Sequence, residues 1–228
     1  MRLPITPATT LWRALRDEVR RDYRAGRVIL GIDGIDGAGK STFADGFAET
    51  FAEEGVAVYR ASIDDFHRPR AERYAGGRTS PEGFYRDSFD YATFRRVLID
   101  PFRDGAQTGA TTGFQLAAFD VARDAPLSAQ WVTAPRDAVL IVDGIFLHRT
   151  ELRGIWHWSL WLDVPFEVAY ARMAERDGCD PDPLASSNRR YYEGQGLYRR
   201  DAQPEAAASA IVDNADFAHP VRVYRDFC

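Results

Sequence analysis

The residues best suited to chemistry lie in the stretch Gly-Ile-Asp-Gly-Ala-Gly-Lys-Ser, residues 34–41. This stretch matches the pattern G-x-x-x-x-G-K-[ST], whose glycines let backbone N–H groups curl around phosphates. Lys40 is the only lysine among the 29 lysine and arginine residues of the chain. Its compact ammonium can reach between the β- and γ-phosphates of a nucleotide, where a planar guanidinium is too bulky. The predicted nucleotide-binding residues are Gly34, Asp36, Gly37, Ala38, Gly39, Lys40, Ser41 and Thr42.

Three aspartates form a second group of candidate catalytic residues. Asp64 and Asp65 follow one apolar run, and Asp143 follows another. In an open parallel sheet, ligands bind outside the carboxyl ends of the strands, so these acids should meet the phosphate-binding stretch. Asp143 and Ser41 are the predicted ligands of Mg²⁺, directly or through water, although Asp143 could instead cap a helix. One of the paired aspartates is expected to act as a general base and the other to cap a turn.

Arginines supply the third group. Arg172 and Arg176 are four residues apart, so both guanidiniums should lie on one side of a helix. There they could neutralise charge on a phosphoryl group during its transfer. A solvated helix face is the alternative. A weaker version of the same argument applies to Arg189, Arg190, Arg199 and Arg200.

The elements that must position these residues alternate between strands and helices. Apolar, β-branched runs predict strands over 27–32, 56–61, 138–142, 158–164 and 210–212. Helical spacing predicts helices over 9–24, 41–52, 90–99, 165–176 and 189–200. Residues 68–90 are interpreted as a loop or lid, and 105–135 as turn-rich. This alternation predicts an α/β three-layer fold, with a parallel sheet covered by helices on both faces.

Length and composition predict one domain spanning residues 1–228. Within it we expect an N-terminal helix in 1–26, an acceptor-site loop in 66–90 and a lid with its helix in 172–200. The net charge of −5 argues against a dedicated nucleic-acid or membrane binder. No apolar run reaches 18 residues, no secretory leader is recognisable, and Cys179 and Cys228 show no metal-binding spacing. These features predict a cytoplasmic protein.

Five stretches of the sequence together resemble the uridine kinase group of P-loop kinases. This group also includes phosphoribulokinase, bacterial-type pantothenate kinase and nicotinamide riboside kinase. The resemblance covers about residues 27–213. It is carried by residues 31–42, Ser-Ile-Asp-Asp-Phe-His (62–67), Asp-Ser-Phe-Asp-Tyr (87–91), Val-Asp-Gly-Ile-Phe (142–146) and Ala-Arg-Met-Ala-Glu-Arg-Asp (171–177).

The resemblance implies ATP-dependent phosphoryl transfer, with Mg²⁺, to a small-molecule hydroxyl. It implies that Asp64 is the catalytic base and that Lys40, Arg172 and Arg176 stabilise the transferring group. The implied acceptor-binding residues are Asp65, His67, Phe89 and Asp90. The metal-linked acid of such kinases is commonly glutamate, and here it is Asp143.

The identity of the acceptor stays open among several alternatives. A ribonucleoside is the first expectation, because Asp90 can bind vicinal hydroxyls. However, Val-Ala-Arg-Asp follows Phe119-Asp120, where uridine-cytidine kinases carry a base-reading histidine. Nicotinamide riboside, pantothenate or a sugar phosphate are alternatives, the last because four arginines lie in 68–78.

A different class of function also remains open. The chain could be an ATP-binding regulatory protein that has no acceptor. A GTPase is excluded, because its Asn-Lys-x-Asp motif needs a second lysine. A homodimer is possible.

Overall fold

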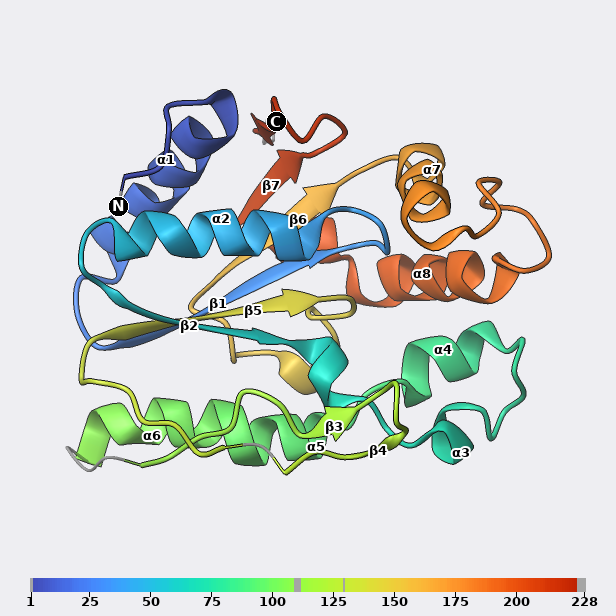
Figure 1. Cartoon of the computed structure of the whole chain (residues 1–228), viewed down its shortest axis with the longest axis horizontal. Helices are drawn as coiled ribbons and strands as arrows, with labels where there is room; N and C mark the ends of the chain where they lie inside the picture. Colours follow the sequence, from blue (N-terminus) through green and yellow to red (C-terminus); the bar gives the residue numbers. More distant parts are fainter. Residues whose placement is uncertain (1, 109–111, 129, 225–228) are drawn as a thin grey trace.

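The computed structural model describes residues 2–108, 112–128 and 130–224 and places them around one central sheet (Figure 1). The strand order in this sheet is β2-β5-β1-β6-β7-β8, and β3 and β4 form a separate hairpin. The main strands are β1 (Arg27–Gly34), β2 (Ala57–Ser62), β5 (Ala138–Gly144), β6 (Trp158–Asp163), β7 (Ala210–Asp213) and β8 (Val221–Val223). The hairpin consists of β3 (Phe119–Asp120) and β4 (Ala125–Pro126). Cys228 lies outside the described residues.

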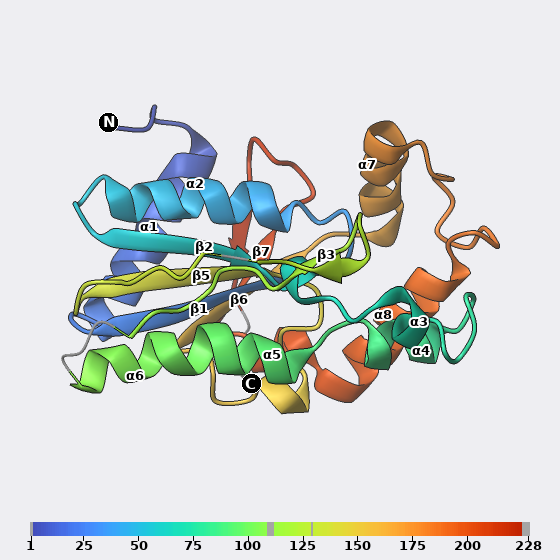
Figure 2. The same cartoon turned by 60° about the horizontal axis from the view of Figure 1, so that its bottom comes forward.

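Helices cover both faces of the sheet, which confirms the predicted three-layer α/β fold. Helix α2 lies on one face, with α1 beside it, and α5 and α6 lie on the other (Figures 1 and 2). The helices are α1 (Pro7–Asp22), α2 (Lys40–Ala52), α3 (Arg70–Arg73), α4 (Pro81–Asp87), α5 (Tyr91–Phe94), α6 (Asp100–Thr108), α7 (Phe166–Asp177), α8 (Arg189–Ala202) and α9 (Pro204–Ala207). A π-helical stretch, Arg95–Ile99, joins α5 to α6, and short 3₁₀ turns span Ile63–Phe66 and Thr150–Leu152.

The first five strands of the sheet order are parallel, and their central members are fully covered. Every residue of β1 and of β5 is buried. A strand covered on both faces needs apolar side chains on both sides, which explains the continuous apolar runs. The edge strand β8 was not predicted, and it pairs antiparallel with β7.

The prediction of a loop over 68–90 was wrong for part of this segment, which contains α3 and α4. Ser80 caps α4 by accepting a hydrogen bond from the N–H of Gly83, and Pro81 occupies its first turn. Phe84 and Tyr85 are buried in the core. The many turn residues concealed this helix, because its only apolar anchors are two adjacent aromatics that pack against a distant helix.

The prediction that residues 105–135 are turn-rich was also wrong for the first residues of this segment. Helix α6 continues through Thr108, and the predicted β-excursion near 115–120 is the two-residue strand β3.

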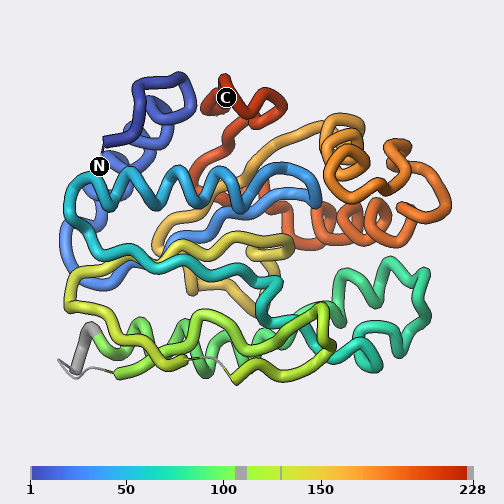
Figure 3. Tube along the Cα trace, viewed as in Figure 1, coloured from blue at the N-terminus to red at the C-terminus, as the bar shows by residue number. Residues whose placement is uncertain are grey.

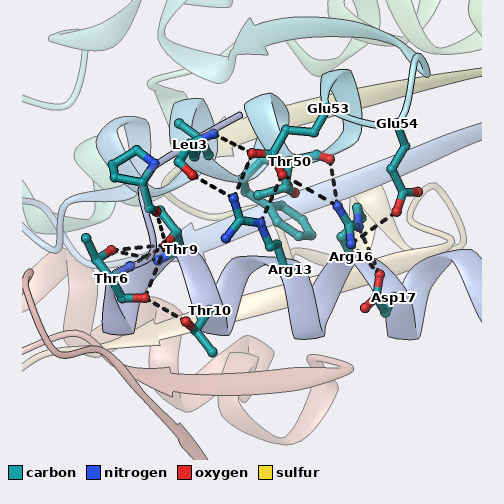
Figure 4. Close-up of polar contacts among 12 residues, drawn as sticks. Leu3, Thr6, Thr9, Thr10, Arg13, Arg16, Asp17, Thr50, Glu53 and Glu54 are labelled. Carbon is teal, nitrogen blue, oxygen red and sulfur yellow. Dashed lines mark hydrogen bonds and ion pairs between the residues drawn. The ribbon is translucent and has the colours of Figure 1, made fainter. Parts of the chain in front are cut away.

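Helix α1 docks along α2, the helix that follows the phosphate-binding stretch (Figure 4). Arg13 donates to both carboxylate oxygens of Glu53, at 2.9 and 2.8 Å. Arg16 donates to the carbonyl of Thr50, in the last turn of α2, at 2.9 Å. These contacts place positive charge at the negative end of the α2 dipole. The N-terminal helix is therefore part of the packed domain.

The parallel strands all end on the same side of the molecule. Beyond their carboxyl ends lie the segments that contain α3, α4, α7 and α8 (Figure 3). The strand ends therefore face the segments expected to bind substrates.

Candidate active site

The phosphate-binding stretch forms a tight loop between β1 and α2, and two of its glycines are required by geometry. Gly37 and Gly39 have φ angles of 75° and 85°, which disfavour residues with a Cβ atom. A Cβ at Gly37 would lie 2.4 Å from the carbonyl oxygen of Ala169, and one at Gly39 would lie 2.2 Å from the ring of Phe217. The loop thus lies in close contact with α7 and with the segment after β7.

Side chains from the loop and from residues outside it bind the backbone of the loop. Lys40 Nζ donates to the carbonyl of Ile35 at 2.8 Å. Asn214 Nδ2 donates to the carbonyl of Ala38, also at 2.8 Å. The N–H of Gly34 is bound by the carboxylate of Asp33, so Gly34 shapes the loop from the end of the strand. Six of the eight predicted loop residues line a pocket, whereas Gly34 and Ala38 do not.

Ser41 and Asp143 lie together at the start of α2 and the end of β5. The Ser41 hydroxyl donates to Asp143 Oδ2 at 2.7 Å, which leaves the lone pairs of Oγ free for a cation. Hydroxyl and carboxylate oxygens are the hard donors that Mg²⁺ prefers. No group of three or more His, Cys, Asp or Glu side chains in the described ranges forms a metal cage. A site in which phosphates and water supply most ligands needs none, so these residues fit a nucleotide-bound Mg²⁺.

Asp64 lies in the 3₁₀ turn Ile63–Phe66 that follows β2, and Gly144 brings this turn close to β5. A Cβ at Gly144 would lie 2.1 Å from Cγ2 of Ile63, and its φ of 152° also disfavours a side chain. The glycine of the Asp-Gly pair therefore allows the turn to pass beside Asp143. This close approach explains physically why an aspartate followed by a glycine ends β5.

Asp64 is exposed to a pocket, although nearby protein atoms still reduce the hydration of its carboxylate. This desolvation raises the pKa of Asp64, and the charges of Asp36 and Asp143 raise it further against the opposing effect of His67 and Lys40. A carboxylate with a raised pKa binds a proton more readily than an exposed one does. This property suits a group that must accept a proton from a hydroxyl.

A pocket of 410 Å³, which we call the nucleotide pocket, lies between the loop and the predicted acids and arginines. Its lining residues are Asp36, Gly37, Gly39, Lys40, Ser41, Thr42, Asp64, Asp143, Arg172, Met173, Glu175, Arg176 and Phe217. The structure thus brings together most of the predicted nucleotide-binding, metal-binding and catalytic residues.

A second pocket of 460 Å³ begins at His67, three residues beyond Asp64. The Nδ1 atom of His67 lies 2.7 Å from the carbonyl oxygen of Asp64, and the imidazole lies against the ring of Phe89, with 4.6 Å between centroids. Burial lowers the pKa of His67. The second pocket is lined by the aromatic residues Phe66, Phe119 and Trp131 and by the polar residues Glu72, Asp90, Thr93, Arg96 and Gln115, among others.

The remaining predicted acceptor-binding residues have different positions. Asp90 lines the second pocket and caps α5 by accepting from the N–H of Thr93 at 2.9 Å. Burial acts to raise the pKa of Asp90, but its hydrogen bonds with Thr93 outweigh this and keep the pKa low. Phe89 is buried and lines neither pocket, and its ring packs against the imidazole of His67. Asp65 lies outside both pockets.

The two arginines of α7 line the nucleotide pocket but have protein partners. Arg172 donates to the carbonyls of Asn214 and Ala215, at 2.9 and 2.8 Å. Its guanidinium also lies 3.6 Å from the ring centroid of Phe217. Arg176 forms a two-point ion pair with Asp177 and is exposed. Both hydrogen bonds of Arg172 use the same terminal nitrogen, and the other, Nη1, has no hydrogen-bond partner among the described residues.

Two parts of the site were not predicted from the sequence. Arg60 of β2 pairs with Asp143, and the segment after β7 supplies Asn214 and Phe217 against the loop. The second could have been found, because it follows the carboxyl end of a parallel strand. The first had no signal, since Arg60 lies in the interior of a strand.

Comparisons with known proteins agree with this geometry. The chain is 26% identical over 150 residues to a uridine kinase of Deinococcus deserti, covering 65% of this chain and 68% of that protein. It is similar to the structure of a possible uridine kinase from Bacillus stearothermophilus, with a TM-score of 0.68, 23% identity and coverage of 90% of this chain and 96% of that one. No protein-family model matches the chain.

Other solved structures share the fold. A putative fructose transport system kinase from Silicibacter sp. TM1040 gives a TM-score of 0.65 at 24% identity, covering 87% of this chain and 96% of that one. Phosphoribulokinase from Rhodobacter spheroides gives 0.55 at 18% identity, covering 82% and 70%. The predicted resemblance and the α/β fold class are therefore confirmed. No helix in the described part of the chain is both long and apolar enough to cross a membrane.

Proposed function

We propose that this chain, a small-molecule kinase with a P-loop, transfers the γ-phosphoryl group of ATP to a hydroxyl of an uncharged, ribonucleoside-like acceptor. One observation carries the proposal: two residues that are close in the chain line different pockets. Asp64 lines the pocket of the phosphate-binding loop, and His67, whose Nδ1 lies 2.7 Å from the Asp64 carbonyl oxygen, lines the second pocket. A base in this position can act on a hydroxyl presented from the second pocket.

The residues divide the reaction between them. The loop N–H groups and Lys40 bind the phosphates of ATP and hold the γ-phosphoryl group near Asp64. Ser41 and Asp143 would hold Mg²⁺, which when bound neutralises charge on the β- and γ-phosphates. Asp64 orients the acceptor hydroxyl and takes its proton as the oxygen attacks the γ-phosphorus. The bond from that phosphorus to the bridging oxygen breaks, and ADP and the phosphorylated acceptor leave.

The second pocket favours an acceptor that carries hydroxyls but no phosphate. Arg68 donates to the carbonyl of Phe89, and Arg73 donates to the carbonyl of Arg68. Neither these arginines nor Arg70 or Arg78 line the pocket, whose lining includes one arginine, Arg96. A phosphate dianion would be poorly compensated there, while the aromatic residues suit a flat ring and the carboxylates suit hydroxyl donors.

Nicotinamide riboside and pantothenate remain alternatives within the same chemistry. Both offer a hydroxyl and lack a phosphate. A non-catalytic ATP-binding protein is the alternative from another class, and it requires no acceptor pocket beside Asp64.

The test is ADP release from ATP and Mg²⁺ with uridine, cytidine, nicotinamide riboside, pantothenate and ribulose 5-phosphate, using Asp64→Asn as the control. We expect turnover with an uncharged acceptor and none in the control. Turnover with ribulose 5-phosphate alone would overturn the proposed acceptor class. Tight ATP binding without turnover on any acceptor would favour the non-catalytic alternative.

A further inference from the structure

The carboxylate of Asp143 has a second partner besides Ser41. Arg60, in the middle of β2, donates through one terminal nitrogen to Asp143 Oδ1 at 2.8 Å. The other carboxylate oxygen, Oδ2, accepts from the Ser41 hydroxyl. Both oxygens are therefore held, each by a residue from a different element, and the rotation of the carboxylate is fixed.

The rest of the Arg60 guanidinium is equally engaged. Its other terminal nitrogen donates to the carbonyl of Ile141 on β5 at 3.0 Å, and Nε donates to Asp45 on α2, also at 3.0 Å. Arg60 thus bridges β5, which carries Asp143, and α2, which begins with Ser41. These contacts use all three nitrogens of the planar guanidinium fork, whereas an ammonium has its donors on a single nitrogen.

The pairing of Arg60 with Asp143 matters because the Asp143 carboxylate is buried. The Asp143 side chain is 3% exposed, and the Arg60 side chain is 24% exposed. A carboxylate so completely covered is costly unless a cation is paired with it. Arg60 supplies that charge on one oxygen and leaves the oxygen beside Ser41 to face the nucleotide pocket.

We infer that Arg60 is a positioning residue for the magnesium site: it holds Asp143, and through it the Ser41 hydroxyl, in the orientation that receives the cation with its nucleotide. This inference rests on the proposed Mg²⁺–nucleotide site, but it does not depend on the identity of the acceptor. Residues that orient metal ligands typically contribute 10- to 100-fold to metal affinity.

The test measures the binding of ADP by calorimetry with Mg²⁺ and with EDTA, so that no acceptor or turnover is needed. The readout is the factor by which Mg²⁺ tightens ADP binding. In Arg60→Met we expect this factor to fall about 10-fold or more, with metal-free ADP binding little changed. Arg60→Lys, which keeps the charge but loses the fork, should fall between Arg60→Met and the wild type.

Arg13→Met is the matched control, because Arg13 is 23% exposed and also pairs with a carboxylate, that of Glu53. It tests for a general effect of losing an arginine ion pair, and it should keep the wild-type factor. An unchanged factor in Arg60→Met would overturn the inference, as would an equal fall in Arg13→Met. If Mg²⁺ fails to tighten ADP binding in the wild type, the proposed magnesium site itself is wrong.

Discussion

His67 and Asp64 are in contact, with 2.7 Å between the imidazole Nδ1 and the Asp64 carbonyl oxygen. Asp64 lines one pocket and His67 lines the other, so the short turn from Asp64 to His67 contacts both.

Asp64→Asn should reduce kcat by roughly 10²- to 10⁴-fold, because the amide cannot accept the proton of the acceptor hydroxyl. ATP affinity should change little, since the phosphates are bound mainly by the loop and Lys40. Steady-state kinetics and equilibrium ATP binding measure these two effects. Asp65→Asn is the matched control, because Asp65 lies outside both pockets. An equal loss in both variants would contradict the assignment of Asp64 as the base.

The activity should depend on the protonation of Asp64. Desolvation raises the pKa of this carboxyl above its ordinary value, and only the deprotonated form can act as a base. Activity should therefore be complete above the raised pKa and fall as pH decreases through it. A profile of kcat/KM against pH should show an acidic limb above pH 3.9, the ordinary value for aspartate. A limb at or below that pH would show that another group controls the rate.

Gly144→Ala should destabilise the protein and displace the turn that contains Asp64. The new Cβ would lie 2.1 Å from Ile63 Cγ2, on a backbone with a φ of 152°. We expect a loss of about 1–3 kcal/mol in the free energy of unfolding, measured by urea denaturation, together with reduced kcat. Gly196→Ala is the control: Gly196 lies within α8 with no atom near its Cβ position. It should gain about 0.5–1 kcal/mol. Similar effects at both glycines would contradict the close approach.

Glu53 should make stability depend on pH in the acidic range. Its hydrogen bond with Arg13, aided by the N–H of Leu3, lowers its pKa from 4.5 to about 2. A lowered folded-state pKa means that the stabilisation is complete above pH 4.5 and is lost as pH falls toward 2. Urea denaturation at pH 7 and pH 3 should show the wild type losing much of its advantage over Glu53→Gln at the lower pH. A constant difference between the two proteins would exclude this linkage.

Local sequence patterns identified many of the candidate binding and catalytic residues. The phosphate-binding loop, the acids at strand ends and the alternation of strands and helices are all visible in the sequence. Backbone requirements act over short stretches, and the ends of parallel strands meet at one edge of a sheet whatever the details of packing. These features predicted the fold class and most residues of the nucleotide pocket.

Contacts between distant residues required the tertiary structure. Helix α4 is anchored by Phe84 against α8, where Gly194 leaves room for the ring. The pairing of Arg60 with Asp143 joins two neighbouring strands that are 83 positions apart in the chain. The protein partners of Arg172 come from the segment after β7.

The sequence by itself therefore determined which residues could do chemistry and at which edge of the sheet they would meet. It could not determine which side chains face one another, because that depends on the order of strands and the packing of helices across the sheet. The tertiary structure decided that Asp64 and His67 line different pockets, that the arginines of 68–78 do not line the second pocket, and that Arg60 pairs with Asp143. A pairing energy depends on distance and burial, and only the folded chain sets both.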